Sequence, residues 1–139
     1  MSRRSDQRRD AAFALYESDV SGRQLADVLD GQDAAGFTRA LAQVADGHRP
    51  ELEELIGRHA IDWDVGRIAA LERAIMLVAL AEVAYPEEVP AEEPIPPAGA
   101  IGEAVEVAKE YCGSGAPAFV NGVLDAAVGE LRQNQPGDG

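Results

Sequence analysis

The stretch IMLVALA at residues 75–81 leaves no polar face over two helical turns. We expect it to belong to a helix from about Asp64 to Ala84, and a helix that is apolar on all sides belongs at the centre of a domain. The apolar run Ala74–Ala81 falls well short of the roughly 20 residues that a membrane span needs. The sequence therefore predicts a core helix covered by other helices, and no contact with a membrane.

Helical periodicity extends over most of the remaining chain, and no convincing alternating strand or internal repeat is present. Ser5 can cap the first helix, and Pro50 and Pro117 suit helix starts. Three of the expected amphipathic helices end at or just before Gly22, Gly31 and Gly47, and glycine is a common residue at helix C-termini. We expect an all-α fold, a compact bundle of about seven helices in two packed halves. Besides the core helix, the expected helices span approximately residues 5–20, 25–31, 37–47, 50–59, 101–112 and 117–131.

The length of 139 residues fits a single domain, 1–139. We expect a flexible arm at residues 1–5 and a disordered tail at 133–139. Residues 85–99, YPEEVPAEEPIPPAG, contain five prolines and four glutamates and predict an extended, solvated loop. This loop divides the chain into two helical halves within one domain, because the residues after it are too few to bury a core alone.

Charge is distributed very unevenly. The formal net charge is -13, yet residues 1–9 carry a net charge of +3. The body should repel polyanions, and only the N-terminal segment should attract them. Four arginines supply this positive charge, and arginine grips phosphate oxygens and stacks on unpaired bases. The candidate RNA contacts are therefore Arg3, Arg4, Arg8 and Arg9, although composition fits a merely solvated terminus equally well.

Two aromatic residues could add base-stacking surfaces to these arginines. Tyr16 lies two to three turns along the same expected helix, but a core position with a satisfied hydroxyl is the simpler interpretation. Phe119 stands near the start of the last expected helix, and its position leaves core and exposed platform equally open. From the residues alone, neither side chain is assigned to RNA.

Enzyme and metal functions are not supported by any motif. His48 and His59 lie on different expected helices without a Cys or carboxylate at ligand spacing, so we expect no metal and no cofactor. Nucleophile motifs and phosphate loops are absent, and CGSGA reads as a turn between helices. The single cysteine, Cys112, excludes an internal disulfide, and the N-terminus lacks the apolar stretch of a secretory signal. Cytoplasm is the expected compartment, and the protein is expected not to be an enzyme.

Three segments, taken together, resemble the NusB family of bacterial transcription antitermination factors. They are the arginine arm running into AAFALYESD, the central LERAIMLVALAEV, and AIGEAVEVAKEYCGSGAPAFVNGVLDAAV. Family members show an arginine-rich start ending in QALY, a buried helix, and the motifs AINEAVELAK and KFVNGVLD. The stretches AVEVAK at 104–109 and FVNGVLD at 119–125 are the most specific, and the similarity follows the chain in order over nearly its whole length.

The resemblance implies an all-helical domain without catalysis. Such proteins bind the boxA element of ribosomal RNA leader transcripts together with NusE, a small ribosomal-subunit protein, and join an RNA polymerase antitermination complex. By position, the four arginines match the RNA-binding motif, and Tyr16 and Phe119 match aromatic positions near the RNA. Glu72 matches an acidic position on the NusE-facing side. Some members form a homodimer, and the resemblance leaves monomer and homodimer open for this chain.

The sequence also departs from the family pattern. Phe13 replaces the usual glutamine before ALY, Gly102 replaces the asparagine of AINEA, and Ala118 stands where a lysine often precedes FVNG. These changes predict fewer basic contacts at the Phe119 end. The alternative to an RNA-binding factor is a protein-interaction module without RNA binding of its own.

Overall fold

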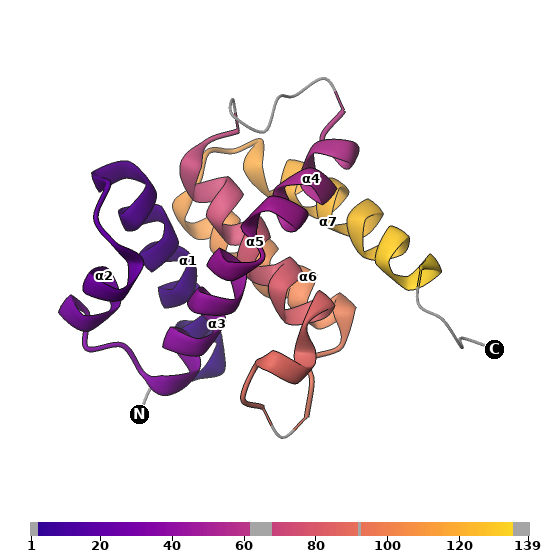
Figure 1. The fold of residues 1–139 in the computed structure, drawn as a ribbon. Coiled ribbons are helices and arrows are strands. Elements are labelled where there is room, and N and C mark those ends of the chain that lie inside the picture. Colours follow the sequence, from indigo (N-terminus) through magenta and orange to yellow (C-terminus); the bar gives the residue numbers. More distant parts are fainter. Residues whose placement is uncertain (1–2, 62–67, 92, 135–139) are drawn as a thin grey trace.

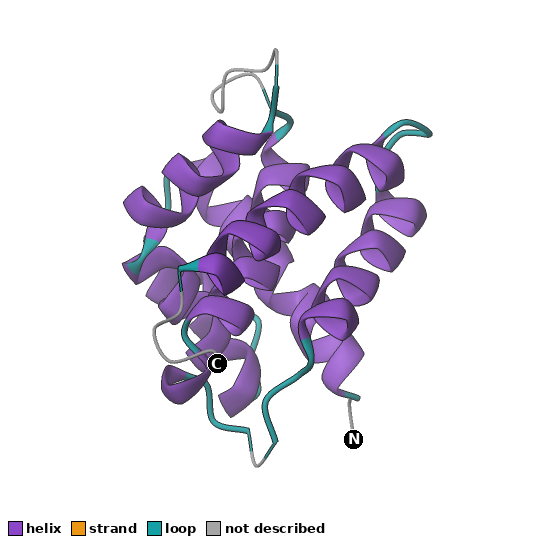
Figure 2. Ribbon diagram, turned by 90° about the vertical axis from the view of Figure 1, so that its right-hand side faces the viewer, coloured by secondary structure: helices purple, strands orange, loops and turns teal. Residues whose placement is uncertain are grey.

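A computed structural model describes residues 3–61, 68–91 and 93–134. Within these residues the chain forms helices joined by loops and turns, without a strand (Figure 2). The helices are α1 (Arg4–Ser21), α2 (Leu25–Gly31), α3 (Gly36–Gly47), α4 (Arg49–His59), α5 (Ala70–Ala84), the short 3-10 helix η2 (Pro86–Glu88), α6 (Pro97–Tyr111) and α7 (Ala116–Gln133). The all-α prediction is confirmed.

Helix α5 forms the centre of the fold, as its apolar sequence predicts. It packs against α1 and α3 on one side and against α4, α6 and α7 on the other (Figure 1). Residues 74–82 are all buried, and one hydrophobic cluster joins side chains from all seven α-helices that the structure describes. The bundle therefore consists of two helical groups, α1–α3 and α4–α7, that share α5 as their common core.

The expected start of this helix near Asp64 lies outside the described residues. In the part that is described, Ile68 and Ala69 precede the helix and α5 begins at Ala70. Ile68 is nonetheless buried in the common core.

The proline-rich segment behaves only partly as predicted. Pro86–Glu88 forms a 3-10 turn, and α6 begins at Pro97 rather than at Ile101, so helix replaces the last residues of the expected loop. Proline fits the first turn of a helix because its missing N–H has no partner there. Since α5 and α6 pack directly against each other, this segment joins two neighbours in one helical group and does not separate two halves.

Both chain ends also differ from the expected boundaries. The sequence predicts a flexible arm at residues 1–5. Helix α1 instead begins at Arg4, and Arg3 is its N-cap residue. Helix α7 runs to Gln133 and is followed by Asn134, whereas the remaining residues of the expected tail lie outside the described ones. Among the described helices, none combines the length and apolar content that crossing a bilayer would require.

Candidate nucleic-acid interface

The start of α1 carries two exposed arginines. Arg3 occupies the N-cap position, and Arg4 is the first helical residue. Arg4 Nη1 donates a hydrogen bond to Gln7 Oε1 at 2.7 Å, and its guanidinium carbon lies 4.1 Å from the centre of the buried Phe37 ring. This cation–π contact ties Arg4 to α3, while its charge stays exposed to solvent.

Ser5 is not the helix cap that the sequence predicts. The helix start has no side-chain cap, and Ser5 Oγ instead donates to Glu103 Oε1 of α6 at 3.0 Å. A second bond fixes α1 on its other side, because Thr38 Oγ1 of α3 donates to the Gln7 carbonyl at 3.1 Å. Contacts to α3 and α6 thus replace the cap and hold the first turns of α1 in place.

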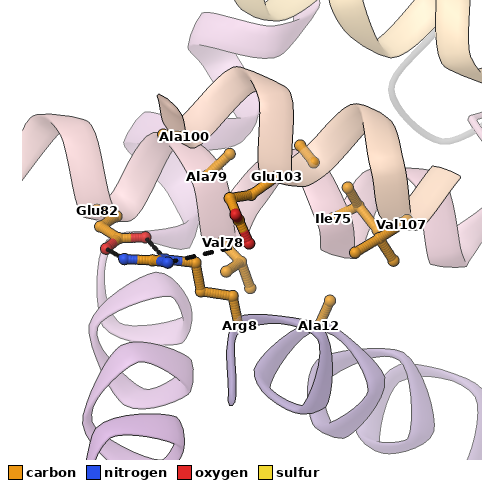
Figure 3. A pocket seen from close by; sticks show the side chains of 10 residues that line it. Arg8, Ala12, Ile75, Val78, Ala79, Glu82, Ala100, Glu103 and Val107 are labelled. Carbon is orange, nitrogen blue, oxygen red and sulfur yellow. Dashed lines mark hydrogen bonds and ion pairs between the residues drawn. The ribbon is translucent and has the colours of Figure 1, made fainter. Parts of the chain in front are cut away.

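Arg8 points into the bundle rather than towards solvent (Figure 3). Its Nε and Nη2 donate to Glu82 Oε1 and Oε2 at 2.7 and 2.8 Å, and Nη1 lies 3.9 Å from Glu103 Oε2. The side chains of Arg8 and Glu82 are 15% and 4% exposed. Although burial acts to lower it, the pKa of Arg8 is raised because the hydrogen bonds and charge of Glu82 favour the cation.

Arg9 lies on the outer side of the same helix turn. It contacts Asp6 Oδ1 at 3.4 Å and Asp10 Oδ1 at 3.2 Å, and its side chain is 30% exposed. Burial acts to lower the pKa of Arg9, but the bond to Asp10, together with the charges of Asp10, Tyr111 and Asp6, raises it. These surface contacts are longer than those of Arg8 and are the kind that contribute little to stability.

Tyr16 extends the outer face of α1. It lies seven residues after Arg9, and this spacing returns to the same helix face after about two turns. Tyr16 is 38% exposed, so the core position favoured from the residues alone is wrong. Phe13 lies between the two, four residues after Arg9, and its ring meets Tyr111 of α6 edge-to-face with 5.0 Å between ring centres.

Phe119 and Glu72 lie at a different part of the surface. Both line a hollow of about 370 Å³ between the start of α5 and the turn from α6 to α7. Phe119 is half-buried against the core and also borders a second hollow of about 240 Å³ with Ile61 and Gly122. The structure therefore brings Phe119 and Glu72 together, although the sequence predicts an RNA contact for Phe119 and a protein contact for Glu72.

The predicted site residues thus fall into three settings. Arg3, Arg4, Arg9 and Tyr16 are accessible on α1, Arg8 is held by Glu82, and Phe119 shares a hollow with Glu72. Sequence reasoning missed Phe13 and Tyr111 as a surface pair. The spacing of Phe13 from Arg9 was a usable signal, whereas nothing in the sequence places Tyr111 beside α1.

The described residues show no grouping of three or more His, Cys, Asp or Glu side chains suited to a metal ion. His59 Nε2 lies 2.9 Å from Glu130 Oε1, and the His48 ring stacks on Tyr85 with 3.6 Å between ring centres. Burial and the charge of Glu72 raise the pKa of the Cys112 thiol, which makes it a poor nucleophile. Recognition through charge and aromatic surface is the chemistry that this arrangement supports.

Comparisons with known proteins agree with this picture. The family model described as the NusB family matches residues 5–128. Transcription antitermination protein NusB of Bacillus subtilis is 32% identical over 136 residues, which cover 95% of this chain and 99% of that protein. The protein of the same name from Rubrobacter xylanophilus is 33% identical over 147 aligned positions, covering 99% of this chain and all of that protein.

Solved structures support the same fold. T. maritima NusB superposes with a TM-score of 0.81 at 23% identity, covering 93% of this chain and 92% of that one. A crystal structure of antitermination factors NusB and NusE in complex with double-stranded RNA contains a chain that matches with a TM-score of 0.74 at 24% identity, covering 91% and 96%. At these identities the similarity establishes the arrangement of the helices.

Proposed function

The chain belongs to the NusB family, and on that premise we propose that it is a transcription antitermination factor that binds boxA RNA of ribosomal RNA leader transcripts together with NusE. Its relatives over nearly their full length carry the name transcription antitermination protein. In this role it joins the RNA polymerase elongation complex in the cytoplasm and recognises RNA without catalysing a reaction.

One observation carries the proposal for RNA. Accessible arginines and an exposed tyrosine lie on the same helix, α1, of a molecule that is otherwise acidic. Arg3 and Arg4 are exposed, and Arg9 and Tyr16 share the outer face of α1. Arginine supplies phosphate contacts, and an exposed aromatic ring supplies a surface on which an unpaired base can stack. We propose Phe119 as a second aromatic contact, reached from the hollow that it borders.

Arg8 has a different place in this proposal. Its hydrogen bonds to Glu82 occupy Nε and Nη2, and its side chain is only 15% exposed, so the RNA role predicted for Arg8 rests on the family motif alone. With three accessible arginines, phosphate contacts predict a slope of log K against log salt concentration near about -2.1 on single-stranded RNA. Three phosphate contacts alone do not give tight RNA binding, so a protein partner must contribute to the affinity.

We propose that NusE supplies this help and that the acidity of the body recruits it. Residues 10–139 carry a net charge of -16, which would steer a basic protein towards the bundle. Glu72 lies in the first turn of α5 beside an open hollow, and we propose it as part of the NusE-facing surface. RNA and NusE would then meet on neighbouring surfaces of one domain comprising residues 1–139.

The test is a titration of short boxA and scrambled RNAs of equal composition, with and without NusE, at two salt concentrations. We expect a preference for boxA that strengthens when NusE is present. The triple variant Arg3→Ala, Arg4→Ala, Arg9→Ala should lose most RNA binding and keep NusE binding. Arg23→Ala is the matched control, because Arg23 is an exposed arginine near the other end of α1 that pairs with Glu17.

Each other outcome has a defined meaning. A wild-type protein that binds NusE but binds neither boxA nor scrambled RNA would be a protein-interaction module without RNA binding of its own. Equal boxA affinities with and without NusE would remove the cooperative role. Light scattering at several concentrations would show whether a homodimer forms.

A further inference from the structure

Two aromatic side chains far apart in the sequence form a surface pair beside Arg9. Phe13 lies on α1 and Tyr111 is the last residue of α6, and their ring planes cross at 87° with 5.0 Å between the ring centres. This edge-to-face arrangement is the favourable geometry for an aromatic pair. It fixes the orientation of Tyr111 although that residue lies at a helix end.

The exposure of Tyr111 is unusual for this chain. Among the described residues, the large hydrophobic side chains that remain exposed are Tyr16, Val20, Ile61 and Tyr111, and Tyr111 is 42% exposed. Phe13 is half-buried, and its ring stands nearly perpendicular to the Tyr111 ring. Tyr111 therefore presents an aromatic ring to solvent that the contact with Phe13 orients. A ring that is already held in place loses little conformational freedom when a base stacks on it.

A cation stands directly beside this surface. Arg9 precedes Phe13 by one helical turn and so lies on the same face of α1, and Tyr111 is near enough to be among the groups that raise the pKa of Arg9. The partners of Arg9 at 3.2 and 3.4 Å are exposed carboxylates of its own helix. Exposed ion pairs of this kind are weak, so Arg9 can exchange them for a phosphate, whereas the buried partner of Arg8 does not permit such an exchange.

The charge pattern favours nucleic acid over protein as the ligand of this surface. Residues 1–9 are net positive while the rest of the chain is strongly negative, so a basic protein is drawn to other faces and a polyanion to this one. Alternating arginine and aromatic side chains bind single strands, because every base offers a flat face and every nucleotide a phosphate. Arg9, Phe13 and Tyr16 follow one face of α1 over about 10 Å, with Tyr111 alongside Phe13.

We propose that the Phe13–Tyr111 pair is a base-stacking platform for single-stranded RNA, with Tyr111 as the stacking ring, Phe13 as the residue that positions it, and Arg9 as the adjacent phosphate contact. This inference rests on the proposed function and adds two residues to its RNA site. Phe13 stands where the family motif usually has glutamine, so the pair includes a departure from that motif.

The experiment compares Tyr111 variants of the full chain in boxA RNA titrations with NusE present. Tyr111→Ala should weaken binding about 5- to 150-fold, the range for removing a base-stacking aromatic. Tyr111→Phe should bind within about twofold of wild type because the ring remains. Tyr111→Leu keeps an apolar contact with Phe13 but lacks a flat ring, and it should bind as weakly as Tyr111→Ala.

The salt dependence separates stacking from charge. Tyr111→Ala should leave the slope of log K against log salt unchanged, whereas Arg9→Ala should reduce its magnitude by about 0.7, one phosphate contact. Tyr111→Trp should retain binding, and its indole fluorescence should be quenched on adding RNA relative to the wild-type signal. Circular dichroism must show the same helical content in every variant.

The results distinguish this inference from the function on which it rests. If wild type prefers boxA but Tyr111→Leu binds equally well, the platform is overturned and the proposed function stands. The platform is also overturned if the Tyr111→Trp signal does not respond to bound RNA. If wild type shows no preference for boxA, both the proposed function and the platform fail.

Discussion

The guanidinium of Arg8 and the carboxylate of Glu82 are joined by two hydrogen bonds of 2.7 and 2.8 Å, although 74 positions separate the two residues. Glu82 follows directly after the apolar run of α5 and is buried. A buried carboxylate is unfavourable unless a cation and donors satisfy it. Arg8 supplies both, so one arginine of the N-terminal cluster joins α1 to the central helix.

Removing one member of this pair should destabilise the fold. Arg8→Ala leaves Glu82 buried and unpaired, and we expect a loss of about 3 kcal/mol in the free energy of unfolding, measured by urea denaturation. The double variant Arg8→Met, Glu82→Met should lose less than Arg8→Ala, because no uncompensated charge remains. Arg9→Ala serves as the surface control and should change stability by less than about 1 kcal/mol. Equal losses for Arg8→Ala and Arg9→Ala would contradict the assignment.

The accessible arginines should be distinguishable from Arg8 by salt dependence. Arg3→Ala, Arg4→Ala and Arg9→Ala should each reduce the magnitude of the salt slope for single-stranded RNA by about 0.7, because each removes one phosphate contact. The double variant Arg8→Met, Glu82→Met removes the Arg8 charge together with its buried partner and should leave the slope unchanged, because Arg8 contacts Glu82 rather than a phosphate. Affinity measurements at four or more salt concentrations check this, and an equal change of slope for Arg8→Met, Glu82→Met would place Arg8 among the RNA contacts.

The central helix and the amphipathic helices around it could be predicted from the sequence because their apolar patterns are local. The run at residues 75–81 requires burial on all sides, and α5 is buried accordingly. Helix starts were less predictable. Ser5 has the residue type of an N-cap, but Glu103 of α6 offers its hydroxyl a different partner, and tertiary contacts of this kind override local preference.

The candidate site was predictable in composition and not in orientation. A cluster of arginines shows that positive charge gathers on α1, but which arginine faces inward depends on Glu82, whose position requires the packed bundle. A usable signal did exist, since a carboxylate adjoining a fully apolar run on a central helix needs a buried cation. The contact between Phe13 and Tyr111 had no such signal, because it depends on how closely α6 approaches α1.

Acid should weaken the link between α4 and α7. Hydrogen bonds from Arg58 and then His59 lower the pKa of Glu130 from 4.5 to about 2. A carboxylate with a depressed pKa in the folded state contributes stability above its unfolded pKa and loses that contribution as pH falls through the folded value. Wild type should therefore exceed Glu130→Gln in stability at pH 6, and the difference should shrink between about pH 4.5 and 2.

Urea denaturation at several pH values measures this difference. The control is Glu54→Gln, which removes an exposed carboxylate 3.4 Å from the same Arg58. It should show a much smaller pH-dependent difference, since exposed pairs are weak. A difference between wild type and Glu130→Gln that persists undiminished at pH 2 would show that charge pairing is not its source.

Two glycines should respond to alanine in opposite directions. Gly22 ends α1 with φ at 75°, a left-handed conformation that disfavours a Cβ, whereas Gly102 lies within α6. A Cβ added at either position meets nothing within 4 Å, so backbone preference decides both results. Gly22→Ala should lose about 1 kcal/mol through strain, and Gly102→Ala should gain about 0.5 to 1 kcal/mol because alanine favours the helix. Urea denaturation measures both, and shifts of the same sign would contradict the left-handed conformation at Gly22.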